Sequence, residues 1–188
     1  MLSDMPPDTA APLPQPRDPS GPYRVLCVCL GNICRSPMAE VVLRSQLAAA
    51  GLQDRVIVDS AGTGNWHVGE PMNPPARRQL ERRGYDGSAH QARQFDASWL
   101  AGRDLILAMD SSNLKNLRAL ARQDDSTPDT MRRIRLFGEV AGLDGADVPD
   151  PWGGSTADFA RVLTMLETGM ARVVSQLGSA CLPGTQRG

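Results

Sequence analysis

Hydrophobic residues follow two alternating patterns along the chain. Short apolar runs, typical of buried strands, alternate with longer stretches in which apolar residues recur every three or four positions, typical of amphipathic helices. The short runs predict strands at 23–29, 56–58, 104–108 and 134–137, and the longer stretches predict helices at about 38–50, 73–83, 110–120 and 156–177. Such alternation indicates an α/β fold. We therefore expect one three-layer domain with a four-stranded parallel sheet and helices on both faces.

Helix ends are marked by residues with known positional preferences. Ser36 is expected to cap the first helix and Pro37 to occupy its first helical position, where the missing N–H costs nothing. Gly84 is expected to end the second helix, and Asp110 to cap the third.

The two ends of the chain differ from the middle in composition. Residues 1–22 hold seven of the 15 prolines, namely Pro6, Pro7, Pro12, Pro14, Pro16, Pro19 and Pro22. A segment of this kind buries too little apolar area to offset its ordering entropy, so we expect a disordered Pro-rich leader. The folded domain is then expected at 23–178, followed by a loose C-terminal tail at 179–188.

The overall composition narrows the possible partners. Hydrophobic residues make up 41% of the 188 residues, and 20 basic against 21 acidic residues give a net charge of -1. This balance gives no support to nucleic acid or an anionic membrane as a partner. The sequence has neither a membrane-spanning apolar run nor the start of a signal peptide, so we expect a cytoplasmic protein with reduced cysteines. The spacing of Cys27, Cys29, Cys34 and Cys181 and of the two histidines does not suit zinc, and we expect no metal or cofactor.

The segment from Cys29 to Ser36 has the features of an anion-binding loop. It joins the first strand to the first helix, so its backbone N–H groups and the helix N-terminus can surround one centre. Gly31 and Asn32 tolerate the left-handed backbone angles of a tight turn, and Arg35 adds a planar fork suited to two phosphate oxygens. These donors would also favour an ionised Cys29, a nucleophile facing the anion.

A cysteine that ends a buried strand is more often inert packing, and Cys-x5-Arg alone is a weak pattern. The catalytic interpretation is favoured because several features coincide in this segment: a strand, turn residues, an arginine, a serine and a proline. The loop lacks the Gly-Lys-Ser/Thr of a nucleoside triphosphate site.

With its neighbouring motifs, this loop resembles that of the low-molecular-weight protein tyrosine phosphatases, particularly the bacterial branch. The resemblance covers about residues 23–178. It includes the loop Cys-Leu-Gly-Asn-Ile-Cys-Arg-Ser at 29–36, Asp-Ser-Ala-Gly-Thr at 59–63, Trp-His-Val-Gly at 66–69, His-Gln-Ala-Arg at 90–93, Met-Asp at 109–110 and Val-Pro-Asp-Pro-Trp at 148–152.

The resemblance implies a chemical role for each residue of the loop. Cys29 would attack phosphorus to form a phosphocysteine, while Arg35 holds the equatorial oxygens together with the backbone of Leu30, Gly31, Asn32, Ile33 and Cys34. Ser36 would bind the thiolate and help it leave. Asp150 would serve as general acid and then general base. The implied substrates are phosphotyrosine-containing proteins, with inorganic phosphate as product, and we expect a monomer.

Further residues match supporting positions of the family. Asn32, Ser60 and His90 would hold the turn of the loop, and Trp66 and Trp152 would form aromatic walls around a phenyl ring. Cys34 has two open interpretations, a disulfide partner that protects an oxidised Cys29 and a small apolar filler.

Residues outside these motifs receive no role in the chemistry. We interpret Trp99 as packing. Four arginines of the second helix could attract acidic phosphopeptides, but a solvated helix face is the interpretation that we favour; these are Arg77, Arg78, Arg82 and Arg83.

Two enzymes of the same fold are alternatives. Arsenate reductase needs further cysteines to relay a disulfide, and the sequence has none between Cys34 and Cys181. Protein arginine phosphatases tend to carry threonine where this chain has Ile33, so Ile33 favours phosphotyrosine. A phosphopeptide-binding module without chemistry would be expected to lack Cys29 or Asp150, and both are present.

Overall fold

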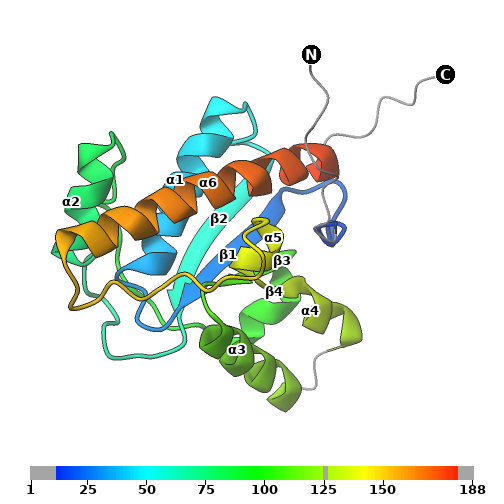
Figure 1. Cartoon of the computed structure of the whole chain (residues 1–188). Helices are drawn as coiled ribbons and strands as arrows, with labels where there is room; N and C mark the ends of the chain where they lie inside the picture. Colours follow the sequence, from blue (N-terminus) through cyan, green and yellow to red (C-terminus); the bar gives the residue numbers. More distant parts are fainter. Residues whose placement is uncertain (1–11, 125–126, 182–188) are drawn as a thin grey trace.

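A parallel sheet of four strands in the order β2-β1-β3-β4 forms the centre of the protein (Figure 1). The computed structural model describes residues 12–124 and 127–181. The strands are β1 (Tyr23–Cys29), β2 (Val56–Gly62), β3 (Leu105–Ala108) and β4 (Ile134–Leu136). All three pairings are parallel, so the carboxyl ends of the strands share one edge.

Helices cover both faces of this sheet. They are α1 (Arg35–Ala49), α2 (Pro74–Arg82), the 3₁₀ helix η1 (Ala97–Gly102), α3 (Ser111–Gln123), α4 (Pro128–Arg133), α5 (Phe137–Val140) and α6 (Thr156–Cys181). Val25 and Cys27 point into a core shared with α1 and α6, whereas Leu26 and Val28 point into a core shared with η1 and α3. Because β1 is buried on both faces, its sequence is almost continuously apolar rather than alternating.

The α/β fold and all four strands were expected, and the structure confirms them. The second strand is longer than expected and runs to Gly62, and the fourth ends at Leu136 because Phe137 begins α5. The short helices η1, α4 and α5 were not predicted, since each has too few residues to show a helical period.

The first helix begins earlier than expected. It starts at Arg35 with Cys34 in the cap position, so Ser36 lies inside the helix and the prediction that it caps the helix is wrong. The Ser36 hydroxyl instead lies 3.0 Å from the Cys29 sulfur and accepts from the Asn32 side-chain amide at 2.9 Å, so it bonds to the loop and not to a backbone N–H of the helix. The expected cap of α3 is confirmed, because the Asp110 side chain accepts from the Asn113 N–H at 2.7 Å.

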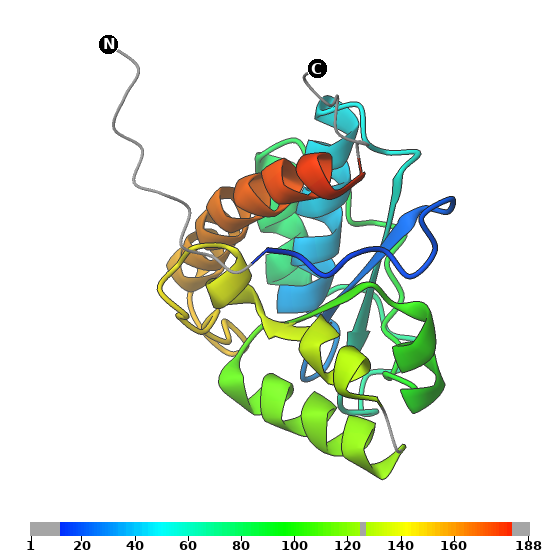
Figure 2. The ribbon, with the colours of Figure 1, turned by 90° about the vertical axis from the view of Figure 1, so that its right-hand side faces the viewer.

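The expected disordered leader is wrong for residues 12–22, which pack on the domain as an arm. Figure 2 shows this arm, in dark blue, crossing the molecule between α6 and α4. Leu13 is buried in the core, and the Tyr23 hydroxyl donates to the Pro14 carbonyl at 2.9 Å. The backbone N–H of Arg17 donates to the buried Asp104 carboxylate at 2.6 Å. The burial of Leu13 and these hydrogen bonds therefore order a segment whose composition predicted disorder. Residues 1–11 lie outside the described residues.

The far end of the chain also differs in part from expectation. Helix α6 continues to Cys181, so residues 179–181 of the expected tail are helical, and 182–188 lie outside the described residues. Among the residues that the structure describes, no helix has the length and apolar character needed to cross a membrane.

Leu13→Ala should lower the free energy of unfolding by about 2 kcal/mol, because it removes a buried side chain from the contact between arm and core. Urea denaturation measures this change. The exposed Val68 gives a matched control, and Val68→Ala should change the value by less than about 0.5 kcal/mol. Equal stability of Leu13→Ala and the parent protein would show that the arm does not pack on the domain in solution.

Candidate active site

The loop between β1 and α1 lies at the carboxyl edge of the sheet, where parallel α/β proteins bind ligands. Its turn depends on Asn32, which is fully buried and has a left-handed backbone with φ of 55°. The Asn32 side chain donates to the hydroxyls of Ser36 and Ser60, both at 2.9 Å, and accepts from the Arg93 N–H at 2.9 Å. These bonds hold a backbone conformation that costs free energy for a residue with a Cβ.

His90 holds the same turn from a second side. Its Nε2 donates to the Asn32 carbonyl oxygen at 2.7 Å. Burial lowers the pKa of His90, although the bond to Asn32 opposes this shift. The imidazole is therefore neutral at pH 7 with its proton on Nε2. Ser60 and His90, to which the family resemblance gives the role of supporting the loop, thus both contact Asn32.

Gly62 allows the loop to approach β2 closely, a role that the sequence analysis missed. It pairs with Cys29 in the register of β1 and β2. A Cβ on Gly62 would lie 2.6 Å from the Leu30 carbonyl oxygen and 3.0 Å from the Asn32 nitrogen. Only the register of the two strands reveals this constraint, because Gly62 lies far from the loop in sequence.

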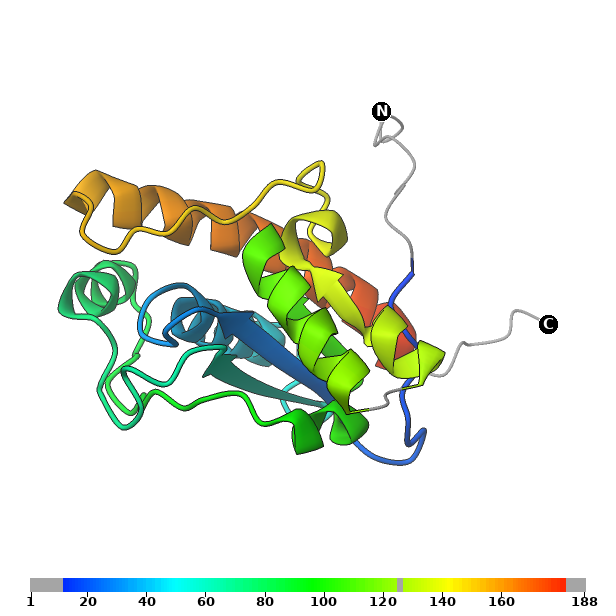
Figure 3. The same cartoon turned by 90° about the horizontal axis from the view of Figure 1, so that it is seen from below.

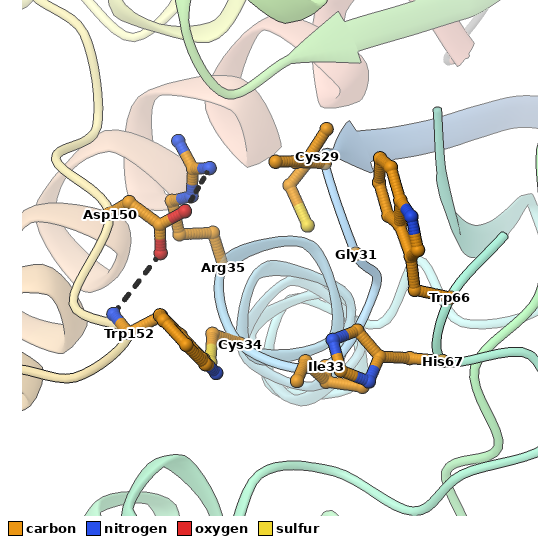
Figure 4. A pocket seen from close by; sticks show the side chains of 10 residues that line it. Cys29, Gly31, Ile33, Cys34, Arg35, Trp66, His67, Asp150 and Trp152 are labelled. Carbon is orange, nitrogen blue, oxygen red and sulfur yellow. Dashed lines mark hydrogen bonds and ion pairs between the residues drawn. The ribbon is translucent and has the colours of Figure 1, made fainter. Parts of the chain in front are cut away.

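The Cys29 sulfur lies beside two polar groups, the Ser36 hydroxyl and the Asn32 N–H. It is 3.0 Å from the Ser36 hydroxyl oxygen and accepts from the Asn32 N–H at 3.3 Å. The N–H of Asn32 can only donate, whereas the Ser36 hydroxyl also lies 3.2 Å from the Ala61 carbonyl and would turn its hydrogen to the sulfur when the sulfur carries negative charge. Figure 4 shows the sulfur directed into the cavity rather than into the core.

Arg35 joins the loop to two distant carboxylates. One terminal nitrogen donates to Asp110 at 2.5 Å and to the Val148 carbonyl at 3.2 Å, and the other donates to Asp150 at 2.8 Å. Burial alone would lower the pKa of Arg35, but negative charge on Cys29, Asp110 and Asp150 outweighs burial and raises it. The buried Nε has no hydrogen-bond partner within the described chain, so the guanidinium keeps a donor for an anion.

Asp110 was expected only as a helix cap. It performs that function through one oxygen, while its other oxygen accepts from Arg35. The Met-Asp motif at 109–110 was the available signal in the sequence. A carboxylate at the end of β3 is well placed to meet a loop at the end of β1, because these strands are neighbours.

Asp150 approaches the cavity from the segment between α5 and α6. Its side chain is 44% exposed, one oxygen accepts from Arg35, and the other accepts from the Trp152 N–H at 3.2 Å. The carboxylate is thus oriented by two donors yet open to solvent, which suits a group that exchanges protons.

The cavity in front of Cys29 has a volume of about 290 Å³ and aromatic sides. Trp66 and Trp152 are 67% and 65% exposed and lie on different sides of it (Figure 4). Every residue that the sequence placed in the loop except the buried Asn32 and Ser36 lines this cavity, and so does His67, which the sequence analysis had left without a role. His67 Nδ1 lies 2.7 Å from the Glu70 carboxylate.

Cys34 lines the same cavity but has a different character from Cys29. Burial, and secondarily the charge on Cys29, raise the pKa of Cys34 to about 12, so this thiol stays protonated at neutral pH. Both cysteines are free thiols in the structure. Across the described ranges, no group of three or more His, Cys, Asp or Glu side chains could hold a metal ion.

Gly62→Ala should displace the loop and lower stability by about 1–3 kcal/mol, because its Cβ has no room beside Leu30 and Asn32. Binding of inorganic phosphate, measured by calorimetry, should weaken in the same variant. Gly102→Ala is the matched control, since a Cβ there meets no atom within 4 Å. If Gly62→Ala bound phosphate as tightly as the parent protein, the close approach would not matter for the site.

Comparison with known proteins places this geometry in a family. The family model described as low molecular weight phosphotyrosine protein phosphatase matches residues 24–181. A low molecular weight protein-tyrosine-phosphatase of Streptomyces coelicolor is 43% identical over 157 residues, which cover 82% of this chain and 94% of the relative.

Solved structures agree with the sequence comparison. The crystal structure of YfkJ from Bacillus subtilis has a TM-score of 0.76 and 34% identity, and the match covers 85% of this chain and 97% of that one. The structure of a YwlE arginine phosphatase variant with a phosphorylated active-site serine is also similar, with a TM-score of 0.73 and 26% identity, covering 88% and 98% of the two chains. The chain therefore belongs to the low molecular weight protein tyrosine phosphatase family.

Proposed function

We propose that this protein hydrolyses phosphotyrosine in proteins through a phosphocysteine intermediate on Cys29. The observation that carries the proposal is the convergence of three groups at one cavity. These groups are a sulfur that accepts from a loop N–H and contacts a hydroxyl, a buried guanidinium whose Nε has no partner among the described residues, and an exposed carboxylate.

Phosphate binding is the first requirement of this chemistry. The loop amides and Arg35 would surround the three non-bridging oxygens, where charge gathers in the transition state. Arg35 is held in place by Asp110 and the Val148 carbonyl, so its direction is fixed before substrate arrives. This pre-organisation lowers the cost of orienting the donors during reaction.

In the first step the Cys29 thiolate attacks phosphorus, a sulfur–phosphorus bond forms and the bond to the tyrosine oxygen breaks. Asp150 gives its proton to that oxygen, so a neutral phenol leaves. In the second step water attacks phosphorus and gives a proton to Asp150. The sulfur–phosphorus bond then breaks, Ser36 stabilises the leaving thiolate, and inorganic phosphate is released.

The cavity favours an aromatic phosphate ester. Trp66 and Trp152 offer apolar surface on different sides of the approach to Cys29. Ile33 adds a further apolar surface within the loop. A phenyl ring would therefore bury apolar area on the way to the sulfur, whereas a phosphorylated serine is too short to use these walls.

A protein arginine phosphatase is the second candidate, since the YwlE structure shares this fold. Ile33 lines the cavity here and is the residue that we propose to favour phosphotyrosine. We further propose that the enzyme acts as a cytoplasmic monomer. Its four free cysteines, including the nucleophile, suit a reducing compartment.

Cys29→Ser should abolish hydrolysis of p-nitrophenyl phosphate while phosphate binding persists, because the donors remain and the nucleophile is lost. Asp150→Ala should lower kcat by about 100-fold or more and change KM little. Cys181→Ser, at the end of α6, provides a matched control that keeps full activity. Substantial turnover by Cys29→Ser would contradict the mechanism.

Phosphotyrosyl peptides should be hydrolysed with a higher kcat/KM than phosphoarginyl peptides of the same sequence. Ile33→Thr should reduce this preference, because it replaces an apolar surface of the cavity with a smaller, polar one. Release of inorganic phosphate from the two peptide series measures both effects. A higher kcat/KM for phosphoarginine in the parent protein would overturn the substrate assignment.

A further inference from the structure

Three arginines lie on α2 and a fourth, Arg83, follows directly after it, and two of the four side chains have no partner in the described part of the chain. Arg77 pairs with Glu81 at 3.1 Å, and Arg83 pairs with Glu167 and donates to Thr164 at 2.9 Å. Arg78 and Arg82 are exposed, and neither side chain makes a hydrogen bond or ion pair within the described ranges. Their positive charge is therefore available to a ligand.

These two arginines line a small cavity of about 70 Å³ between α2 and the segment that leads into α6. Its other lining residues are Pro75, Gln79, Gly154 and Thr156. The buried Gln79 side chain donates to the Thr156 carbonyl at 3.3 Å, which ties α2 to the start of α6. Figure 3 shows α2 beside the first turns of α6, as this contact requires.

Both sides of this cavity are linked through the backbone to residues that line the catalytic cavity. On one side, Gly154 follows Trp152 by two residues. On the other side, the N–H of Asn73, the residue before α2, donates to the carbonyl of Ile33 in the phosphate loop at 2.8 Å. The chain turns between Trp152 and Gly154, where the Gly154 N–H donates to the Pro151 carbonyl at 2.9 Å, so these two residues lie no more than about 7 Å apart. A substrate peptide in extended conformation covers that distance with two or three residues.

Nearby carboxylates are already engaged. Glu81 pairs with Arg77, and Asp158 accepts from the backbone and side chain of Ser155 and lies 3.5 Å from Arg161. An incoming carboxylate would therefore meet two guanidinium groups whose charge no neighbouring acid neutralises. Guanidinium groups bind carboxylates with paired hydrogen bonds.

We propose that Arg78 and Arg82 form a specificity subsite that selects an acidic residue two or three positions from the phosphotyrosine. This rests on the proposed function, because the subsite acts on the peptide whose phosphate reaches Cys29. It also changes the interpretation of these two arginines from a solvated helix face to a substrate contact.

The test uses phosphotyrosyl peptides of neutral sequence in which one Glu is placed at each position from −3 to +3, with a matched series carrying Gln. Glu two or three positions from phosphotyrosine, on one side, should raise kcat/KM about fivefold over Gln, mainly through KM, as expected for two exposed charge pairs. This gain in kcat/KM should become smaller as the salt concentration rises, because salt screens exposed charges.

Variants separate a charge contact from a structural effect. The double variant Arg78→Gln, Arg82→Gln should lose the preference and keep parent turnover of p-nitrophenyl phosphate, which does not reach the subsite. The double variant Arg78→Glu, Arg82→Glu should reverse the charge preference, so that a peptide with Lys at the same position is hydrolysed with a higher kcat/KM than the peptide with Glu. Arg77→Gln is the matched control on the same helix and should retain the preference.

Two outcomes would overturn the inference. Equal kcat/KM for Glu and Gln peptides in the parent protein would remove the subsite and leave the proposed function intact, as would a preference that survives in the double variant. Failure to hydrolyse any phosphotyrosyl peptide would overturn the proposed function, and the inference with it.

Discussion

The backbone of one buried residue, Asn32, determines the geometry of the whole site. Its left-handed conformation turns the loop so that its N–H points at the Cys29 sulfur, and the cost is met by four bonds from other parts of the chain. Ser36 belongs to α1, Ser60 to β2, and His90 and Arg93 to the segment after α2. The loop is therefore rigid because three separate segments specify it, rather than because of its own sequence.

Arg93 extends this support beyond the loop. Its side chain donates to the Ser60 carbonyl at 2.8 Å, pairs with Asp59 at 3.1 Å and lies over the Trp99 ring at 5.0 Å. Trp99 is a residue of η1 and packs against the core that this helix covers, as the sequence predicted. Arg93 thus connects the turn at Asn32 to the core on the second face of the sheet.

The sequence predicted local features of the site better than distant ones. The strand, the left-handed turn at Asn32 and the guanidinium of Arg35 are encoded within a few neighbouring residues, and the resemblance to a family supplied Ser60, His90 and Asp150. The close approach at Gly62 was missed because it arises from the register of two strands. The order of the arm was missed for a similar reason, since Leu13 gains its burial from residues far along the chain.

The shared guanidinium of Arg35 links binding to proton transfer. One terminal nitrogen donates to Asp110 and the Val148 carbonyl, the other donates to Asp150, and Nε has no partner among the described residues. Each terminal nitrogen carries two N–H groups, and Asp150 accepts from only one of those on its nitrogen. Nε and the remaining N–H beside it would therefore offer two donors to a phosphate while both carboxylates keep their bonds to Arg35. The group that binds the phosphate thus also holds the proposed acid next to it. The exposure of the two acids, 19% for Asp110 and 44% for Asp150, matches a division between a buried anchor and an acid that exchanges protons with solvent.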